Sequence, residues 1–281
     1  MKIIKYPDGS SYAKVDNLVP EFTFRINSYE DLWHLQQIID VYVHNNIWPT
    51  VIIPNLFDAQ ADRRFNKNES HGLKLVCGFL TSLHVNFKIF HPHNPEVVEA
   101  AMDNVEIIDN SEFIKKVILQ IEGSGLSDFA SYKCRLENNL ILMSSDAGGF
   151  KPLMKLCDKI KWQGETFSAS KSRQYIEGKS KLIHQIDRND FGGKDILIID
   201  DICVYGGTFI GLAKLLRERN CGKLYLAVSH MTVQNLGQFP ITDYFDKVFT
   251  TNSKYDEYKI DCSADKSIFN KPKNLQIIKM F

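Results

Sequence analysis

The sequence of 281 residues has no excess of charge, since 34 lysines and arginines balance 34 aspartates and glutamates. This balance argues against a protein that binds nucleic acid through net charge alone. The six cysteines form no CxxC pair and no zinc-like spacing, so we expect free thiols in a reducing compartment. No apolar run approaches the roughly 18–20 residues of a membrane span, and the N-terminal MKIIKYPDGSSY lacks the apolar core of a signal peptide. We therefore expect a cytoplasmic protein with no membrane or nucleic-acid partner.

Short apolar runs rich in valine and isoleucine alternate with helical patterns. Because the runs are almost continuously apolar, they predict parallel strands that are covered on both faces, and thus an α/β fold. A polar stretch with glycine and serine, 122–139, predicts a boundary between domains 1–138 and 139–281. The predicted strands are 50–54, 87–91, 105–109, 140–145, 195–200, 223–230, 247–252 and 275–280. The predicted helices are 28–46, 70–83, 94–102, 110–121, 152–160 and 208–219.

The stretch ILIIDDICVYGGTF, residues 196–209, combines a buried strand, two aspartates and a glycine pair before a helix. Ligands of such sheets bind beyond the carboxyl ends of the strands, where Asp200 and Asp201 would lie. Two adjacent carboxylates can hold the vicinal hydroxyls of a ribose or share a divalent cation. Gly206 and Gly207 let the backbone approach an anion, which the Thr208 hydroxyl and the helix amides can bind. A capped helix alone needs only one aspartate, so the pattern favours a ribose-phosphate site.

At these residues the chain resembles the phosphoribosyl-pyrophosphate loop of type I phosphoribosyltransferases and of ribose-phosphate pyrophosphokinases. Other stretches are similar to the pyrophosphokinases, and the resemblance covers nearly the whole chain. They are SSDAGGFKPLMKLCDKI (144–160), SASKSRQYIEG (168–178), AVSHMTV, VFTTN, IPNLFDAQADRRFNKNESHGLKLVCGFL (53–80) and YPDGSSY (6–12).

The resemblance implies two tandem, doubly wound parallel-sheet domains of the type I phosphoribosyltransferase kind. It also implies a diphosphotransferase that moves the β,γ-diphosphoryl group of ATP to the anomeric hydroxyl of ribose 5-phosphate, with Mg²⁺ and release of AMP. A homo-oligomer is expected from the family, although the family's elements before the hairpin and after the last strand have no counterpart here. Lys171 and Arg173 match the Lys-x-Arg of a mobile catalytic loop and would stabilise the transferring group, while a plain solvated basic loop is the alternative.

The expected metal ligands are Asp146, Asp200, Asp201 and His93, the last also counted as catalytic. Asp146 follows a strand and precedes a glycine pair, and carboxylate oxygens suit Mg²⁺. His93 stands where the family carries an Asp-x-His contact to metal or phosphate, but His91 replaces the aspartate. A surface histidine pair is the alternative, and zinc is disfavoured because further ligands are not evident.

The resemblance also suggests the ATP site, with departures. Gln60 and Ala61 replace the family's Arg-Gln before Asp62, and Asn68 replaces another arginine. In the hairpin, Tyr6 replaces a phenylalanine and Ser10 a glutamate, whereas Asp8 is retained. The expected ATP-binding residues are Tyr6, Asp8, Gln60, Asp62, Arg63 and Arg64.

The acceptor loop departs from the family at Val204 and Tyr205, where an aspartate and a threonine are usual. A tyrosine is bulkier than the threonine that helps to hold the sugar's 5-phosphate, and its ring can stack on a base. We hypothesise that the 5-phosphate continues into a larger group, as in ADP-ribose, the acceptor of phage-type relatives that rebuild NAD. The alternatives are an ordinary pyrophosphokinase acting on ribose 5-phosphate, a phosphoribosyltransferase and a non-catalytic regulatory relative.

Overall fold

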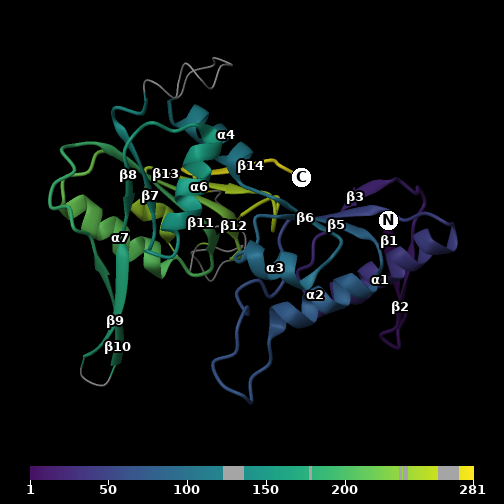
Figure 1. Cartoon of the computed structure of the whole chain (residues 1–281). Helices are drawn as coiled ribbons and strands as arrows, with labels where there is room; N and C mark the ends of the chain where they lie inside the picture. Colours follow the sequence, from purple (N-terminus) through teal and green to yellow (C-terminus); the bar gives the residue numbers. More distant parts are fainter. Residues whose placement is uncertain (123–135, 177–178, 234–235, 237–239, 259–271) are drawn as a thin grey trace. The chain divides into compact units, whose positions relative to one another are not determined.

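The computed structural model of the chain describes residues 1–122, 136–176, 179–233, 236, 240–258 and 272–281, and for 172–176 and 179–183 it describes the backbone alone. The chain forms two compact units (Figure 1). Unit 1 is Met1–Asp109 together with Phe281, and unit 2 is Asn110–Met280. Each unit has its own parallel sheet and its own hydrophobic core.

Unit 1 is built on a four-stranded parallel sheet in the order β3-β4-β5-β6. Helix α1 begins at the N-cap Ser28, whose hydroxyl accepts a hydrogen bond from the amide of Asp31 (3.3 Å). Its apolar stripe, which includes Leu35 and Tyr42, is buried in the same core as the strand residue Val51. The elements are β3 (Glu21–Thr23), α1 (Tyr29–His44), β4 (Thr50–Ile53), α2 (Gly72–Ser82), β5 (Asn86–Phe90), α3 (Pro95–Ala101) and β6 (Val105–Ile108). An antiparallel hairpin of β1 (Lys2–Lys5) and β2 (Ser11–Lys14) precedes them.

Unit 2 is built on a six-stranded parallel sheet in the order β14-β13-β12-β11-β7-β8. Strands β7 and β12 are buried along their whole length, as expected of a parallel sheet with helices on its faces. The strands are β7 (Leu140–Ser144), β8 (Thr166–Ser168), β11 (Asp195–Cys203), β12 (Leu224–Met231), β13 (Lys247–Thr251) and β14 (Leu275–Ile278). The helices are α4 (Ser111–Glu122), α6 (Phe150–Ile160), α7 (Gly207–Glu218) and the short 3₁₀ helix η1 (Ile241–Tyr244).

A separate antiparallel hairpin extends from unit 2 (Figure 1). It consists of β9 (Ser170–Ile176) and β10 (Lys179–Gln185), which pair from Ser170↔Gln185 to Ile176↔Lys179. The sequence suggested a polar loop over 168–178, whereas the structure has strands there. The sequence pattern missed them because neither strand has the alternation of apolar residues that marks a half-buried strand.

The predicted fold class is confirmed, because both units are α/β with parallel sheets, and every strand and helix predicted from the pattern is present. The division between the units lies at Asp109, ahead of the boundary expected after residue 138. Helix α4 belongs to unit 2 because it packs against α6 and β12. Most of the polar stretch used to place the boundary, 123–135, lies outside the described residues.

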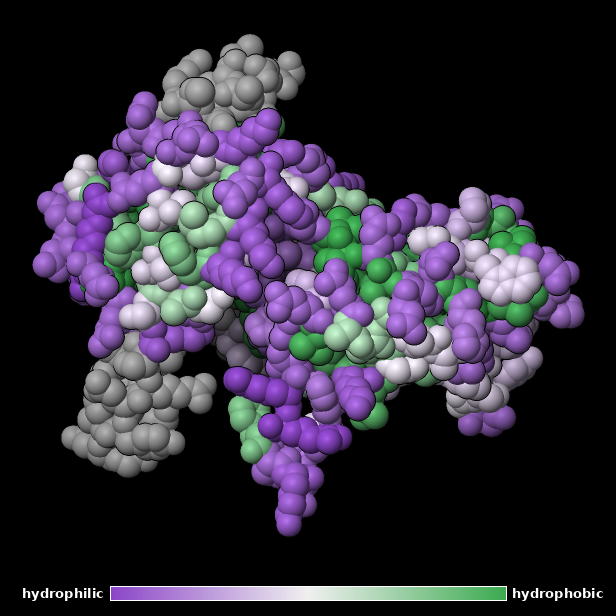
Figure 2. Space-filling model, viewed as in Figure 1, coloured by the Kyte–Doolittle hydropathy of each residue, from purple (hydrophilic) through white to green (hydrophobic). Residues whose placement is uncertain are grey.

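In the part of the chain that the structure describes, no helix has the length and hydropathy needed to cross a membrane. The visible surface is mostly hydrophilic, with smaller hydrophobic areas between the charged side chains (Figure 2). Scattered apolar side chains at the surface are normal for a folded protein.

Candidate active site

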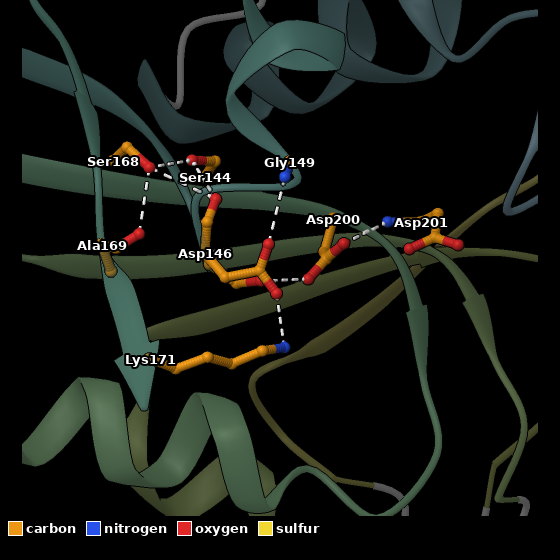
Figure 3. Close-up of polar contacts among 9 residues, drawn as sticks. Ser144, Asp146, Gly149, Ser168, Ala169, Lys171, Asp200 and Asp201 are labelled. Carbon is orange, nitrogen blue, oxygen red and sulfur yellow. Dashed lines mark hydrogen bonds and ion pairs between the residues drawn. The ribbon is translucent and has the colours of Figure 1, made fainter. Parts of the chain in front are cut away.

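Three aspartates gather at the carboxyl edge of the sheet in unit 2. Asp200 and Asp201 lie near the end of β11, and Asp146 follows β7 by two residues. The two strands are neighbours in parallel register, with Ile199 opposite Ser144. The hydroxyl of Ser145 donates a short hydrogen bond to Oδ2 of Asp200, which ties the two strand ends together. Figure 3 shows this edge of the sheet with the aspartates side by side.

Asp200 is the most perturbed carboxyl group of this edge. Burial and the charge of the adjacent Asp201 raise the pKa of Asp200 to about 7, although the hydrogen bond from Ser145 opposes this shift. The amide of Asp201 donates to Oδ1 of Asp200 (2.9 Å). Burial also raises the pKa of the nearby Cys203 to about 12, so this thiol stays protonated and is a poor nucleophile.

Asp146 is held by backbone and by a lysine. Its Oδ1 accepts a hydrogen bond from the amide of Gly149 (3.1 Å), and its Oδ2 forms an ion pair with Nζ of Lys171 (Figure 3). Burial opposes ionisation, but Lys171 and the amide of Gly149 outweigh it and lower the pKa of Asp146. A β-carbon on Gly149 would lie 3.3 Å from Cβ of Ser144, so the glycine allows the close turn. Asp146 is therefore ionised at neutral pH.

The hydroxyls of two serines surround the backbone of Asp146. Ser144 donates to the carbonyl oxygen of Asp146 (2.9 Å), and the Ser168 hydroxyl lies 2.9 Å from that of Ser144 (Figure 3). These residues and Ser145 were not among the predicted site residues. The signal available in the sequence was their position, since each serine lies at the end of a strand beside a predicted site residue.

The loop after β11 has the geometry expected of an anion site. Gly206 has a φ of +75°, and a β-carbon there would lie 2.9 Å from Cδ1 of Ile241, so only glycine fits. Helix α7 then begins at Gly207 without a side-chain cap, which leaves its first amides to a ligand. Thr208 is half-buried in the first turn, Val204 is half-buried, and Tyr205 is 63% exposed.

Of the two cations predicted for catalysis, the structure describes the side chain of one. Lys171 lies on β9 and reaches Asp146, which places its charge at the edge that carries the aspartates. Arg173 lies two positions further along β9, and its side chain lies outside the described residues.

Unit 1 brings together some of the residues predicted for ATP and phosphate. Nδ2 of Asn94, the residue after His93, donates to Oδ2 of Asp62 (3.2 Å). His93 is exposed on the turn before α3. The guanidinium of Arg63 lies over the ring of Phe65, with 5.1 Å between Cζ and the ring centroid. Gln60 and Arg64 are exposed on the same loop.

The hairpin that carries Tyr6 and Asp8 closes on itself. Oδ1 of Asp8 accepts hydrogen bonds from the hydroxyl (2.7 Å) and the amide (2.9 Å) of Ser10, which lower the pKa of Asp8. Tyr6 is 52% exposed and packs against Tyr12, with ring centroids 5.7 Å apart. In this arrangement Asp8 stabilises the turn, while the tyrosine ring remains accessible.

The donor set of unit 2 fits a hydrated magnesium ion. The raised pKa of Asp200 means that a second negative charge beside Asp201 is costly, and a divalent cation removes that cost. Among the described residues, no three or more His, Cys, Asp or Glu side chains form a metal cluster. Mg²⁺ does not need one, because it keeps several waters and binds through one or two carboxylates and substrate phosphates. The full set of expected metal ligands, Asp146, Asp200, Asp201 and His93, stays a prediction.

Residues 123–266, about half of the chain, match the phosphoribosyl transferase domain family. The chain belongs to this family. The match covers β7 to β13 and thus Asp146, Asp200 and Asp201. In doubly wound sheets of this kind, ligands bind at the carboxyl edge, where the loop after β11 lies.

Relatives that match most of the chain carry a name more specific than that of the domain family. Ribose-phosphate pyrophosphokinase of Saccharolobus solfataricus is 24% identical over 234 residues, which are 80% of this chain and 74% of the relative. Ribose-phosphate pyrophosphokinase 1 of Listeria innocua is 30% identical over 204 residues, 72% of this chain and 59% of the relative. The crystal structure of phosphoribosylpyrophosphate synthetase from Mycobacterium smegmatis superposes with a TM-score of 0.69 at 16% identity, covering 99% of this chain and 85% of that one.

These relatives confirm the expected resemblance to ribose-phosphate pyrophosphokinases, the fold and the class of enzyme, a diphosphotransferase. They support ribose 5-phosphate, the alternative acceptor, better than ADP-ribose, and they do not show a relation to the phage-type branch. For a phosphoribosyl transferase domain of this kind, the roles of the individual site residues remain predictions.

Proposed function

We propose that the protein transfers the β,γ-diphosphoryl group of ATP to the C1 hydroxyl of ribose 5-phosphate and releases AMP. The observation that carries the proposal is the meeting of Lys171 with Asp146 at the sheet edge that holds Asp200 and Asp201. An aspartate pair and an anion loop suffice to bind a ribose phosphate. The cation Lys171, which lies on the hairpin at the same edge, adds the positive charge that stabilises a transferring diphosphoryl group.

The acceptor fits the loop in one orientation. Asp200 and Asp201 accept hydrogen bonds from the two vicinal ribose hydroxyls. The 5-phosphate binds at the start of α7, between the amides of Gly207 and Thr208 and the Thr208 hydroxyl.

The transfer itself needs alignment and charge stabilisation. The oxygen of the C1 hydroxyl forms a bond to the β-phosphorus of ATP, and the bond from that phosphorus to the oxygen of AMP breaks. AMP leaves with the electron pair, and the hydroxyl proton passes to water. Lys171 and Arg173 bind the oxygens of the diphosphoryl group during the transfer. Asp200 and Asp201, with Asp146 nearby, would hold Mg²⁺, which would neutralise the phosphate charge.

For ATP binding we propose residues of unit 1. Arg63 and Arg64 provide positive charge for phosphates, Asp62 is positioned by Asn94, and the exposed ring of Tyr6 offers a surface for adenine. Gln60 and Asp8 complete this set, and His93 is proposed as a catalytic residue that contacts metal or phosphate. We propose that the enzyme acts as a homo-oligomer.

A second acceptor, ADP-ribose, is favoured by one observation. Tyr205 is 63% exposed on the acceptor loop, so its ring can stack on a base attached beyond the 5-phosphate. ADP-ribose offers the same free C1 hydroxyl and such a base. The two acceptors therefore differ in what Tyr205 contacts.

The test is an assay of AMP release from ATP and Mg²⁺ with ribose 5-phosphate, with ADP-ribose or without acceptor. AMP release that depends on ribose 5-phosphate supports the proposal, and release that depends mainly on ADP-ribose supports the second acceptor. Pyrophosphate release from phosphoribosyl pyrophosphate and a base, without AMP formation in the first assay, would replace both with a phosphoribosyltransferase. Nucleotide binding without any turnover would favour a regulatory protein.

A further inference from the structure

His184 on β10 lies directly opposite Lys171 on β9 in the antiparallel hairpin. Residues that pair in this way have side chains on the same face of the two strands, with Cβ atoms about 4.5–5.5 Å apart. The imidazole of His184 and the lysine that reaches Asp146 are therefore neighbours. His184 was not among the predicted site residues, because nothing in the sequence around it marks a motif.

The ring of His184 packs tightly against helix α7. A β-carbon built on Gly211 would lie 2.8 Å from both Cδ2 and Nε2 of His184, which is closer than any real contact. Glycine weakens a helix interior relative to alanine, so its presence in the second turn of α7 has a packing reason. The close approach of His184 to the helix backbone is that reason.

The polar atoms of His184 are unusual for a packing residue. Nδ1 is buried and has no hydrogen-bond partner within the described part of the chain. Burial, and then the charge of Lys171, lower the pKa of His184, so the ring is neutral at pH 7. A neutral ring does not repel the ammonium group beside it. Lys171 can thus extend toward Asp146 while His184 holds the base of the hairpin.

We propose that His184 is a positioning residue that fixes the β9–β10 hairpin on helix α7 through Gly211, and so sets where Lys171 stands relative to the anion site. The proposal rests on the function proposed above. Helix α7 carries Gly207 and Thr208 in its first turn and Gly211 in its second, on the same face as Gly207 by helical spacing. The helix that binds the 5-phosphate therefore also seats the hairpin that carries the catalytic cation.

This arrangement links acceptor and cation through one rigid element. Binding of the 5-phosphate at the start of α7 would hold the acceptor on the same helix that seats the hairpin through the Gly211–His184 contact. Loss of the contact leaves the acceptor site intact, because Asp200, Asp201 and the loop do not touch His184 in the contacts described. The expected defect is in turnover and not in acceptor binding.

The first experiment compares His184→Ala and His184→Gln with the unaltered chain. For His184→Ala, kcat should fall by about tenfold or more while KM for ribose 5-phosphate changes by less than about threefold. His184→Gln keeps a side chain that reaches the position of Nε2 against Gly211, so it should retain most of kcat. Hydrogen exchange of the β9 amides should be about tenfold faster in His184→Ala, with β11 unchanged.

The second experiment approaches the contact from the helix. Gly211→Ala should lower kcat and speed exchange in β9, because its new methyl group displaces His184. Gly78→Ala in α2 is the matched control, since a β-carbon there meets nothing within 4 Å. It should leave both readouts unchanged. In the double variant Gly211→Ala/His184→Ala, the two losses should combine to less than their product.

Three results would overturn the proposal. One is wild-type kcat together with wild-type exchange of the β9 amides in both His184→Ala and Gly211→Ala. Another is faster exchange with wild-type kcat, which would make the contact purely structural. The third is reduced kcat with unchanged exchange, which would give His184 some role other than positioning. Absence of diphosphoryl transfer by the unaltered chain would instead refute the proposed function, and the exchange data would still test the contact.

Discussion

Nζ of Lys171 forms an ion pair with Oδ2 of Asp146, so the cation of the hairpin and a carboxylate of the sheet edge meet in the structure. The carboxylate is held from its other side by the amide of Gly149 (3.1 Å). We propose that the oxygens of the transferring diphosphoryl group replace Asp146 as the partner of Lys171. The ion pair then serves to keep the lysine extended toward the site before ATP binds.

Replacement of Lys171 tests this account. Lys171→Met should lower kcat by about 10²–10³-fold, the usual cost of removing one preorganised group that stabilises a transition state. Stability should change by less than about 1 kcal/mol, because the lysine side chain is 41% exposed and solvent screens the ion pair.

The matched control for Lys171 is Lys194, which forms an ion pair with Glu165 in the same unit (3.0 Å) and lies away from the aspartates. Lys194→Met should leave kcat unchanged. Equal losses of kcat in both variants, measured with melting curves to confirm folding, would show that Lys171 has no special role.

The pH dependence of stability should reveal Asp200. Its pKa is raised to about 7 in the fold, above the value of an unfolded chain. A raised carboxyl pKa contributes stability that is fully present below about pH 4 and is lost as the pH rises to about 7. Asp200→Asn removes this loss, so at pH 8 it should be more stable than the unaltered chain by about 2–4 kcal/mol.

The measurement for Asp200 is thermal melting of both proteins from pH 4 to pH 8 without added metal. The gap between the two curves should widen with pH and then level off above about pH 7. A gap that does not vary with pH would mean that Asp200 titrates normally. Mg²⁺ at pH 8 should stabilise the unaltered chain more than Asp200→Asn, because the cation favours the ionised carboxylate.

Gly206 should be sensitive to any side chain. Gly206→Ala combines a φ of +75° with a β-carbon 2.9 Å from Cδ1 of Ile241, so it should destabilise unit 2 by about 1–3 kcal/mol and raise KM for the acceptor. Gly192→Ala is the control, because it has a φ of +60° and nothing within 4 Å. It should cost stability without altering KM. If Gly206→Ala and Gly192→Ala have similar KM values for the acceptor, Gly206 has no specific role in acceptor binding.

Tyr205 should govern the choice between acceptors. Tyr205→Thr, which restores the residue usual in pyrophosphokinases, should shift the ratio of kcat/KM in favour of ribose 5-phosphate over ADP-ribose by about tenfold. The exposed ring contributes little to stability, so melting should change by less than about 0.5 kcal/mol in free energy. An unchanged ratio would leave Tyr205 without a part in acceptor choice.

The sequence pattern predicted most strands of the two parallel sheets, because each of these strands is a short apolar run bounded by polar turns, and it predicted the α-helices between them. It missed β3 and β8, which are three residues long. It also placed Asp146, Asp200 and Asp201 at one edge, since the carboxyl ends of neighbouring parallel strands meet there. The ion pair of Lys171 with Asp146 could not be predicted, because it depends on how the hairpin folds back. That hairpin has no apolar alternation of its own, and the close approach of His184 to Gly211 leaves no motif in the sequence.

The role of Asp8 shows a second limit. The ATP contact that the resemblance suggests for Asp8 stays a prediction, and the structure adds two hydrogen bonds from Ser10 to Asp8 that close the turn. Serine replaces the glutamate of the family at this position, and a short hydroxyl can bind the carboxylate two residues earlier. Local hydrogen bonds of this kind depend on side-chain rotamers, which sequence patterns do not specify.

The most direct test of the central claim is ³¹P NMR of the protein with ATP, Mg²⁺ and ribose 5-phosphate. The account predicts a new pair of coupled diphosphate signals on the sugar that appears in step with AMP, and about 10²–10³-fold more slowly with Lys171→Met. Formation of ADP with a single new phosphate at C1 of the sugar, or AMP without a sugar diphosphate, would contradict it.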